Sequence, residues 1–219
     1  MSILLVGRVR AVVLGLAALA AVAPAAQGQS YPGWQVEGSL DYTGPGTVTG
    51  IIAETPTGGY EVHQTETVRY SVGASRLVRV LPRTSVRVGL SLANRGFSER
   101  TSTSTETSTR EVDLLYLGAP ITVGYNLVNA SRGVRPIIEA GVVPELLVRE
   151  DVGGIAQYDL RDTGISWLVS MGLKYNTGNG RALLLAPEAR IAARDYSRPG
   201  PGMSDYHPVT VGLKLGVQF

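Results

Sequence analysis

From Trp34 onward, apolar and polar side chains alternate with a period of two along most of the chain. The first such run extends from Trp34 to Tyr42, and the last extends from Val209 to Phe219. Successive side chains of a β-strand point to opposite faces, so this spacing predicts strands. The same pattern predicts six more strands between these two, at residues 65–80, 84–95, 111–127, 134–149, 163–175 and 181–193. This part of the chain is therefore predicted to be all-β, with eight strands.

One face of these strands is continuously aliphatic, whereas the other carries Gly, Ser and isolated charged residues near the strand middles. The charged residues are Glu37, Arg87, Glu139, Lys174, Glu188, Arg190 and Lys214. A soluble sandwich would bury its apolar face and crowd charges outward, and a lipocalin-like barrel would need an apolar lumen. The pattern instead predicts an antiparallel up-and-down transmembrane β-barrel with lipid against the apolar face. We expect the seven charges to form a structural network that fills a narrow lumen.

Aromatic residues stand near the ends of the apolar faces. Trp34, Tyr42, Tyr125 and Tyr175 fit the two aromatic girdles that mark the membrane interfaces of such barrels, and Phe219 is expected at the lower interface.

The connections between the predicted strands alternate between long and short. The short ones are residues 81–84, 128–133 and 176–180. Outer-membrane barrels have long external loops and short periplasmic turns, so both ends of the barrel domain are expected in the periplasm. Pro120 and Pro144 lie inside predicted strands, and a closed barrel has no edge to accommodate them. We expect a bulge at each, with a local reset of the alternation.

Residues 1–28 have the features of a secretory signal peptide. Two arginines precede an apolar run from Ala11 to Ala23, which Pro24 ends. This run is too short to cross a bilayer as a helix. We therefore divide the chain into a signal peptide at residues 1–28 and an outer-membrane barrel domain at residues 29–219.

Charge and cysteine content narrow the function classes. Without the two leader arginines, the chain carries 18 basic and 18 acidic residues, which gives no support to nucleic acid as a partner. The absence of cysteine excludes disulfides, thiolate metal sites, cysteine nucleophiles and a lipidated N-terminal cysteine. No glycine pattern for nucleotide binding and no convincing set of metal ligands occurs, so we expect no cofactor and no metal.

A tract of Thr and Ser at residues 100–110 lies between the third and fourth predicted strands, and residues 65–67 lie at the same height on the second. The tract could be a solvated loop, but Thr favours strands. We predict that strands two to four extend above the membrane as a Thr-rich ribbon, whose exposed edge could bind a protein partner. The first loop (44–60) and the last loop (198–203) are rich in Gly and Pro, and we expect both to be mobile.

The two histidines, His63 and His207, fall in or near external loops, and Ser204 and Asp205 are close to the second in sequence. One such cluster does not establish a nucleophile, a base and an orienting acid, so we expect no catalytic residue and no enzyme. The three lumen glutamates could be taken for a glycosidase pair, but cations at a comparable depth favour a structural network.

Two segments carry a resemblance to a known family, Tyr116 to Tyr125 and Arg135 to Gly141. They resemble the core of the PorT-like outer-membrane β-barrel proteins of Bacteroidota and relatives. The closing strand is similar too, and its terminal Phe219 resembles the signal read by the barrel-assembly machinery. The resemblance implies an eight-stranded barrel integral to the bacterial outer membrane, without a cofactor, that meets this machinery during insertion.

We expect a monomeric, non-enzymatic barrel in contact with outer-membrane lipid. Its lumen is predicted to be filled with side chains, and its external loops to bind, to shield or to serve a membrane complex. Three alternatives stay open: a narrow passive pore, a lipid-modifying enzyme at the rim, and an accessory subunit of a secretion system.

Overall fold

The computed structural model describes residues 33–44, 51–55, 58–102, 106–128, 133–152, 159–177, 181–197 and 206–219, and the predicted signal peptide lies outside them. The strands within these residues are β1 (Gly33–Gly44), β2 (Ile51–Thr55), β3 (Gly58–Thr65), β4 (Thr67–Arg79), β5 (Thr84–Asn94), β6 (Phe97–Ser102), β7 (Thr107–Gly118), β8 (Ile121–Asn126), β9 (Gly133–Val152), β10 (Thr163–Asn176), β11 (Ala182–Ala192) and β12 (Val209–Gln218). Among the described residues, no helix is long and apolar enough to cross a membrane.

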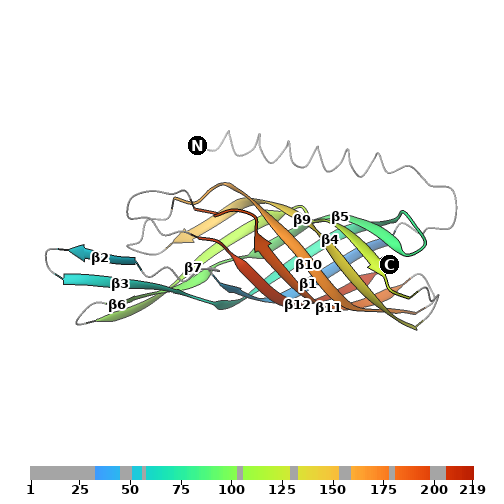
Figure 1. Ribbon diagram of the computed structural model, residues 1–219, viewed down its shortest axis with the longest axis horizontal. Helices are drawn as coiled ribbons and strands as arrows, with labels where there is room; N and C mark the ends of the chain where they lie inside the picture. Colours follow the sequence, from blue (N-terminus) through green and yellow to red (C-terminus); the bar gives the residue numbers. More distant parts are fainter. Residues whose placement is uncertain are drawn as a thin grey trace.

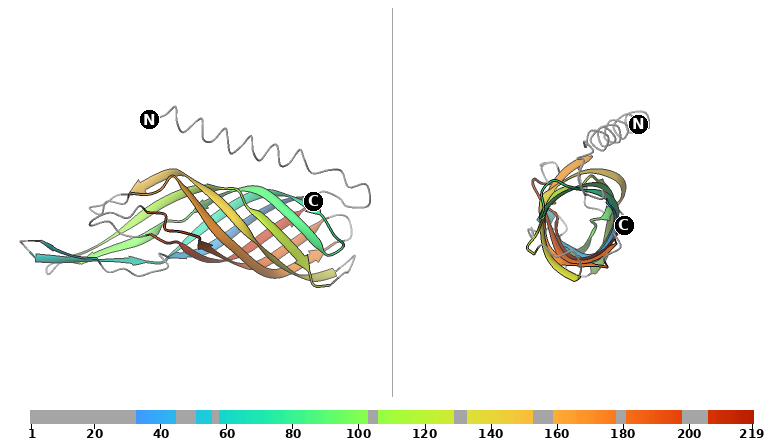
Figure 2. Two further views of the ribbon diagram at one scale, coloured as in Figure 1. Left: turned by 45° about the horizontal axis from the view of Figure 1, so that its top comes forward. Right: turned by 90° about the vertical axis from the view of Figure 1, so that its right-hand side faces the viewer.

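Eight strand positions close into a barrel. The hydrogen-bonded order around it is β1, β4, β5, β8, β9, β10, β11 and β12, and β12 pairs with β1 to complete the ring. Each neighbouring pair is antiparallel. The end-on view in Figure 2 shows this closed ring. The prediction of an eight-stranded antiparallel up-and-down barrel is therefore confirmed.

The fourth barrel position is shared by β7 and β8, which Ala119 and Pro120 separate. Proline has no N–H to donate, but the carbonyl of Pro120 accepts a hydrogen bond from the Gly89 nitrogen at 3.1 Å. Leu117 pairs with Leu92 on β5, and Ile121 pairs with Val88, so the register continues across the gap.

The predicted reset of the alternation at Pro120 is thus wrong, and so is the one at Pro144. Pro144 stays opposite Ile165 on β10, and its carbonyl accepts a hydrogen bond from the Ala119 nitrogen at 2.9 Å. The two proline carbonyls keep their ladder bonds, and only the donors are missing. The register shift in this region lies instead between Leu115 and Tyr116 where β7 pairs with β9.

The strand ends that the short connections join lie at the same end of the barrel as the C-terminus (Figure 1). There Trp34 and Phe219 exchange two backbone hydrogen bonds, of 2.8 and 2.9 Å. We call this the turn end, and the opposite end the loop end.

A ribbon of four strands, β2, β3, β6 and β7, projects from the loop end (Figure 1). β3 leads into β4 across one residue, and β6 follows β5 after two, so barrel strands continue into the ribbon as predicted. The hairpin of β2 and β3 was not predicted, and it occupies much of the first loop that was expected to be mobile. The last loop, residues 198–203, lies outside the described residues.

Exposed and buried side chains alternate along the barrel strands. On β10, Trp167 and Val169 are exposed, whereas Ser166 and Ser170 are buried. The exposed face of all eight strand positions is dominated by large apolar residues, and Trp167 is 58% exposed. A continuous outer belt of this kind is typical of a barrel whose wall contacts hydrocarbon.

Candidate functional site: the filled lumen

Six charged side chains of alternating sign form an unbroken chain across the lumen. Arg87 contacts Glu37 and also lies 3.4 Å from Glu139. The Nζ atom of Lys214 lies 2.9 Å from Glu139. The same atom lies 2.8 Å from Glu188, which also contacts Arg190. We call this set the ion-pair chain: Glu37, Arg87, Glu139, Lys214, Glu188 and Arg190.

The ion-pair chain joins five strands, β1, β5, β9, β11 and β12, because all six residues share the inward register. Hydrogen bonds with neutral side chains support it. Gln35 donates to Glu37 at 2.7 Å, Ser170 donates to Glu139 at 3.3 Å, and the Arg87 Nε donates to Thr122 at 3.2 Å. Three carboxylates and three cations balance, which is the condition under which buried charge is tolerated.

Lys174 was predicted to belong to the charge network of the lumen, but it is not part of the ion-pair chain. It lies on the inward face of β10 but is only half-buried, and no ion pair to it is formed within the described residues. Its direct cross-strand neighbour is Arg135, another cation. Alternation gives the facing of a side chain but not its depth or its partner, and Lys174 stands near the end of its strand.

A second charged group, which the sequence analysis missed, lies above the ion-pair chain. Arg95 donates from Nε to Glu145 at 2.8 Å and from Nη1 to Thr210 at 2.8 Å. Ser166 donates to the other oxygen of Glu145 at 2.8 Å, and Tyr196 donates to that oxygen too. Arg95 has the same strand parity as Arg87, and Glu145 the same as Glu139. Extending the alternation past the strand middles would have found this pair.

Aromatic rings fill the lumen at the loop end. Tyr196 and Tyr206 come from the connection between β11 and β12, Tyr116 comes from β7, and Phe97 from β6. All four are fully buried, with ring centroids 4.8 Å apart for Phe97 and Tyr206 and 5.3 Å apart for Tyr116 and Tyr196. Leu114 and Leu160 pack in the same cluster. We call these four rings the aromatic cap.

Hydrogen bonds fix the cap to the charged group beneath it. The Tyr206 hydroxyl donates to the Arg95 carbonyl, and the Tyr196 hydroxyl lies 2.8 Å from Ser166. Burial raises the pKa of the Tyr196 hydroxyl, and the charge of Glu145 raises this pKa further. Tyr196 therefore stays a neutral hydrogen-bond donor at physiological pH.

Glycine makes room for the cap. A Cβ atom at Gly164 would come within 2.3 Å of the Tyr196 ring. The ring thus packs directly on the backbone of β10, at a position where any other residue would displace it.

Some apolar side chains also face the lumen toward the turn end, which the polar-face prediction did not include. Ile137, Leu184 and Ala186 form a small buried cluster there. The lumen therefore consists of an apolar cluster, the ion-pair chain, the Arg95–Glu145 group and the aromatic cap, and all of these are built from packed side chains.

The predicted interface aromatics all lie on the outer wall. Trp34, Tyr42, Tyr125, Tyr175 and Phe219 are each exposed by between 44% and 58%. Trp34 and Phe219 are at the turn end, with Tyr125 and Tyr175 close to the ends of β8 and β10, and Tyr42 is near the loop end of β1. The girdle role and the assembly-signal role of Phe219 stay predictions.

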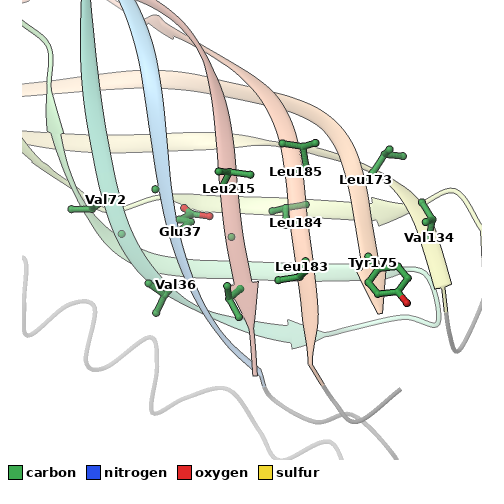
Figure 3. A pocket seen from close by; sticks show the side chains of 14 residues that line it. Val36, Glu37, Val72, Val134, Leu173, Tyr175, Leu183, Leu184, Leu185 and Leu215 are labelled. Atoms are coloured by element: carbon green, nitrogen blue, oxygen red, sulfur yellow. The ribbon is translucent and has the colours of Figure 1, made fainter. Parts of the chain in front are cut away.

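An apolar hollow near the turn end is lined by residues of this wall, among them Val36, Leu183, Leu185 and Leu215 (Figure 3). Glu37 is its charged lining residue, and its carboxylate is held by Arg87. Besides Glu37, the Tyr175 hydroxyl is the polar side-chain group of the lining, so the hollow offers mainly hydrocarbon contact.

The histidines do not define a site within the described residues. His63 lies in β3 of the ribbon, and His207 lies just before β12 with its Nδ1 3.1 Å from Asp195. Ser204 and Asp205 fall outside the described residues. In the part of the chain that is described, no group of three metal-ligating side chains comes together.

Comparison with known proteins agrees with this architecture. Residues 26–218 match the family described as outer membrane protein beta-barrel domain. The outer membrane protein OprG from Pseudomonas aeruginosa is similar at 14% identity over 88% of this chain and 98% of that chain, with a TM-score of 0.52. Neisserial surface protein A (NspA) is similar at 13% identity over the same shares, also with a TM-score of 0.52.

No curated protein matches the chain in sequence. The family match covers the whole barrel, from before β1 to the last residue of β12. The chain belongs to the outer membrane protein β-barrel domain family and is an integral protein of the bacterial outer membrane.

Proposed function

We propose that this protein is a closed, non-enzymatic barrel that anchors an external binding ribbon in the outer membrane. The observation that supports a closed lumen is its continuous filling. Arg87 and Lys214 in the ion-pair chain and Tyr196 in the aromatic cap are fully buried, at two levels of a narrow barrel. A conducting path would have to break the ion-pair chain and displace the aromatic cap.

Planar-bilayer recording of the purified protein tests the closed lumen. We expect no steady openings from the wild type. The triple variant Tyr196→Ala/Tyr206→Ala/Arg87→Ala removes side-chain bulk from the aromatic cap and from the ion-pair chain, and it is expected to conduct. Steady nanosiemens-scale openings of the wild type would contradict the proposal and favour the narrow passive pore.

The binding role is supported by the shape of the ribbon. Its outermost strand, β2, pairs only with β3 among the described residues, so one row of backbone groups is open. Such an edge can accept a strand from another protein. Our preferred partner is therefore a protein chain that adds to this edge, and the barrel itself is expected to be monomeric.

Pulldown of tagged protein in mild detergent tests this role. Ser108 pairs with Thr101 across β6 and β7, so Ser108→Pro disturbs the ribbon without touching the lumen. A partner that is captured by the wild type and lost with Ser108→Pro supports the proposal. Equal capture by both, or capture of no protein at all from envelope extracts, contradicts it.

Two further roles are proposed as alternatives, an accessory subunit of a secretion complex and a lipid-modifying enzyme. The PorT-like resemblance supports an accessory role in a secretion complex, which the same pulldown addresses. A lipid-modifying activity at the rim is the remaining alternative. If His63→Ala and His207→Ala leave the mass spectrum of lipid A unchanged, that alternative is excluded.

A further inference from the structure

Three cations stand near one another at the turn end of the barrel, and none of them forms an ion pair within the described residues. Arg79, on β4, and Arg135, on β9, stand at the ends of their strands nearest the turns, and Lys174 is near the end of β10. We call these three residues the cation cluster. All three are on the inward register of their strands, beyond the ion-pair chain. Arg135 and Lys174 are half-buried, whereas Arg79 is exposed at the rim and its Nη2 donates to the Pro82 carbonyl.

The central contact is a pair of like charges. Lys174 and Arg135 are direct cross-strand partners in the register of β9 and β10. Like charges directly opposite one another destabilise an antiparallel pair. Arg79 approaches from another part of the wall, since β5 and β8 separate β4 from β9, and it acts electrostatically on both.

The nearest acid cannot neutralise this cluster. Glu139 is the carboxylate that acts on Lys174, but its Oε2 already contacts Arg87 and Lys214. No ion pair to any of the three cations is formed within the described residues. The ion-pair chain matches its three carboxylates with its own three cations, so none of its acids is left to neutralise the cation cluster.

Donors at this level also lack acceptors. The Nε of Arg135 and the Nδ2 of Asn176 are buried without a hydrogen-bond partner among the described residues. Buried donors of this kind are costly unless an acceptor reaches them. Two guanidinium groups, one ammonium group and an amide donor match the oxygens of a phosphate group.

We propose that the cation cluster binds a phosphate group that enters from the periplasmic end of the barrel. The group lies between Arg135 and Lys174, accepts hydrogen bonds from both, and relieves their repulsion. It is supplied either by free phosphate in the periplasm or by the headgroup of a phospholipid in the adjacent leaflet. The proposal is independent of the binding role of the external ribbon.

The experiment measures thermal unfolding of the whole mature protein in a non-ionic detergent, followed by heat-modifiable gel migration. Inorganic phosphate is titrated at constant ionic strength against chloride. We expect a saturable rise of the unfolding temperature with phosphate. Lys174→Gln should raise the unfolding temperature in chloride, because it removes the repulsion, and should abolish the phosphate response. Arg79→Gln, which leaves the central pair in place, should weaken phosphate binding by about tenfold in calorimetry.

Arg181→Gln is the matched control, because Arg181 is an exposed cation at the same end and precedes β11. It should leave the phosphate response unchanged. A wild type that responds no more to phosphate than to chloride overturns the proposal, and so does an equal loss in Arg181→Gln.

Nanodiscs distinguish the two sources. If a lipid headgroup fills the cluster, the response to added phosphate is lost in phosphatidylglycerol nanodiscs and kept in phosphatidylcholine nanodiscs. If free phosphate is the ligand, the response persists in both. Absence of a response in detergent and in both kinds of nanodisc contradicts either form of the proposal.

Discussion

The Nζ atom of Lys214 lies 2.9 Å from Oε2 of Glu139, although their strands, β12 and β9, are not neighbours in the barrel. The contact therefore spans the lumen. Lys214 also reaches Glu188 on the adjacent β11, so one ammonium group joins two carboxylates. Through it, opposite parts of the wall are held by a bond that backbone pairing does not provide.

Removal of this lysine charge is expected to weaken the barrel strongly. Lys214→Met keeps most of the side-chain volume but leaves Glu139 and Glu188 buried with one cation fewer. The expected loss of unfolding free energy is about 3–5 kcal/mol, the usual cost of breaking a buried pair on one side. Urea unfolding in detergent measures it.

Lys174→Met is the matched control for this prediction. It removes the same charge from the same lumen, outside the ion-pair chain, and is not expected to destabilise. Equal destabilisation by the two substitutions would show that the ion-pair chain has no special role.

Displacement of Tyr196 is expected to open the loop end. Gly164→Ala places a Cβ atom where the ring now lies, so the ring and its hydrogen bond to Glu145 must move. We expect faster proteolysis of the segment between β11 and β12, at nearly unchanged strand content. Gly38→Ala is the control, since its Cβ would meet the nearest atom at an ordinary 3.6 Å. Unchanged proteolysis of Gly164→Ala would mean that the ring does not hold this segment.

The sequence predicted well whether a side chain points to the lumen or to the outside of the barrel, but it predicted poorly how deep in the lumen a side chain lies. Facing follows from the two-residue period alone, so the outward side chains of β10 and β12 were correctly placed. Depth and partner depend on how the barrel closes, and Lys174, predicted to be in the network, forms no ion pair with it among the described residues. The prediction for the register at Pro120 was also wrong. The missing N–H of proline was expected to force a bulge, but the proline carbonyl keeps its hydrogen bond and the two strands stay aligned.

The aromatic cap could not be predicted from the alternation of polar and apolar residues, for a different reason. Tyr196 and Tyr206 lie in a connection without any periodic pattern, and the packing of the Tyr196 ring depends on Gly164, which is distant in sequence. The Arg95–Glu145 pair, in contrast, could have been predicted, since both residues share the inward parity of their strands.

A charged substitution on the outer wall is expected to lower the free energy of unfolding much more than a neutral substitution at the same position. Leu215 is 60% exposed on β12, and Leu215→Arg should cost about 2–4 kcal/mol if it lies near the middle of the bilayer. Leu215→Ala is the control, with a smaller expected loss. Refolding into lipid vesicles followed by guanidine unfolding measures both. A tolerated arginine would indicate that this face is not in hydrocarbon.

The most direct measurement uses the absence of cysteine from the chain, which permits single spin labels without background. A label at Leu213→Cys, on the outward face of β12, is compared in lipid vesicles with one at Thr109→Cys, exposed on the ribbon strand β7. The account predicts that the label at position 213 is relaxed by oxygen dissolved in lipid and hardly by a water-soluble nickel chelate, with the reverse at position 109. Strong relaxation by the nickel chelate at position 213 would contradict a wall whose apolar side contacts lipid.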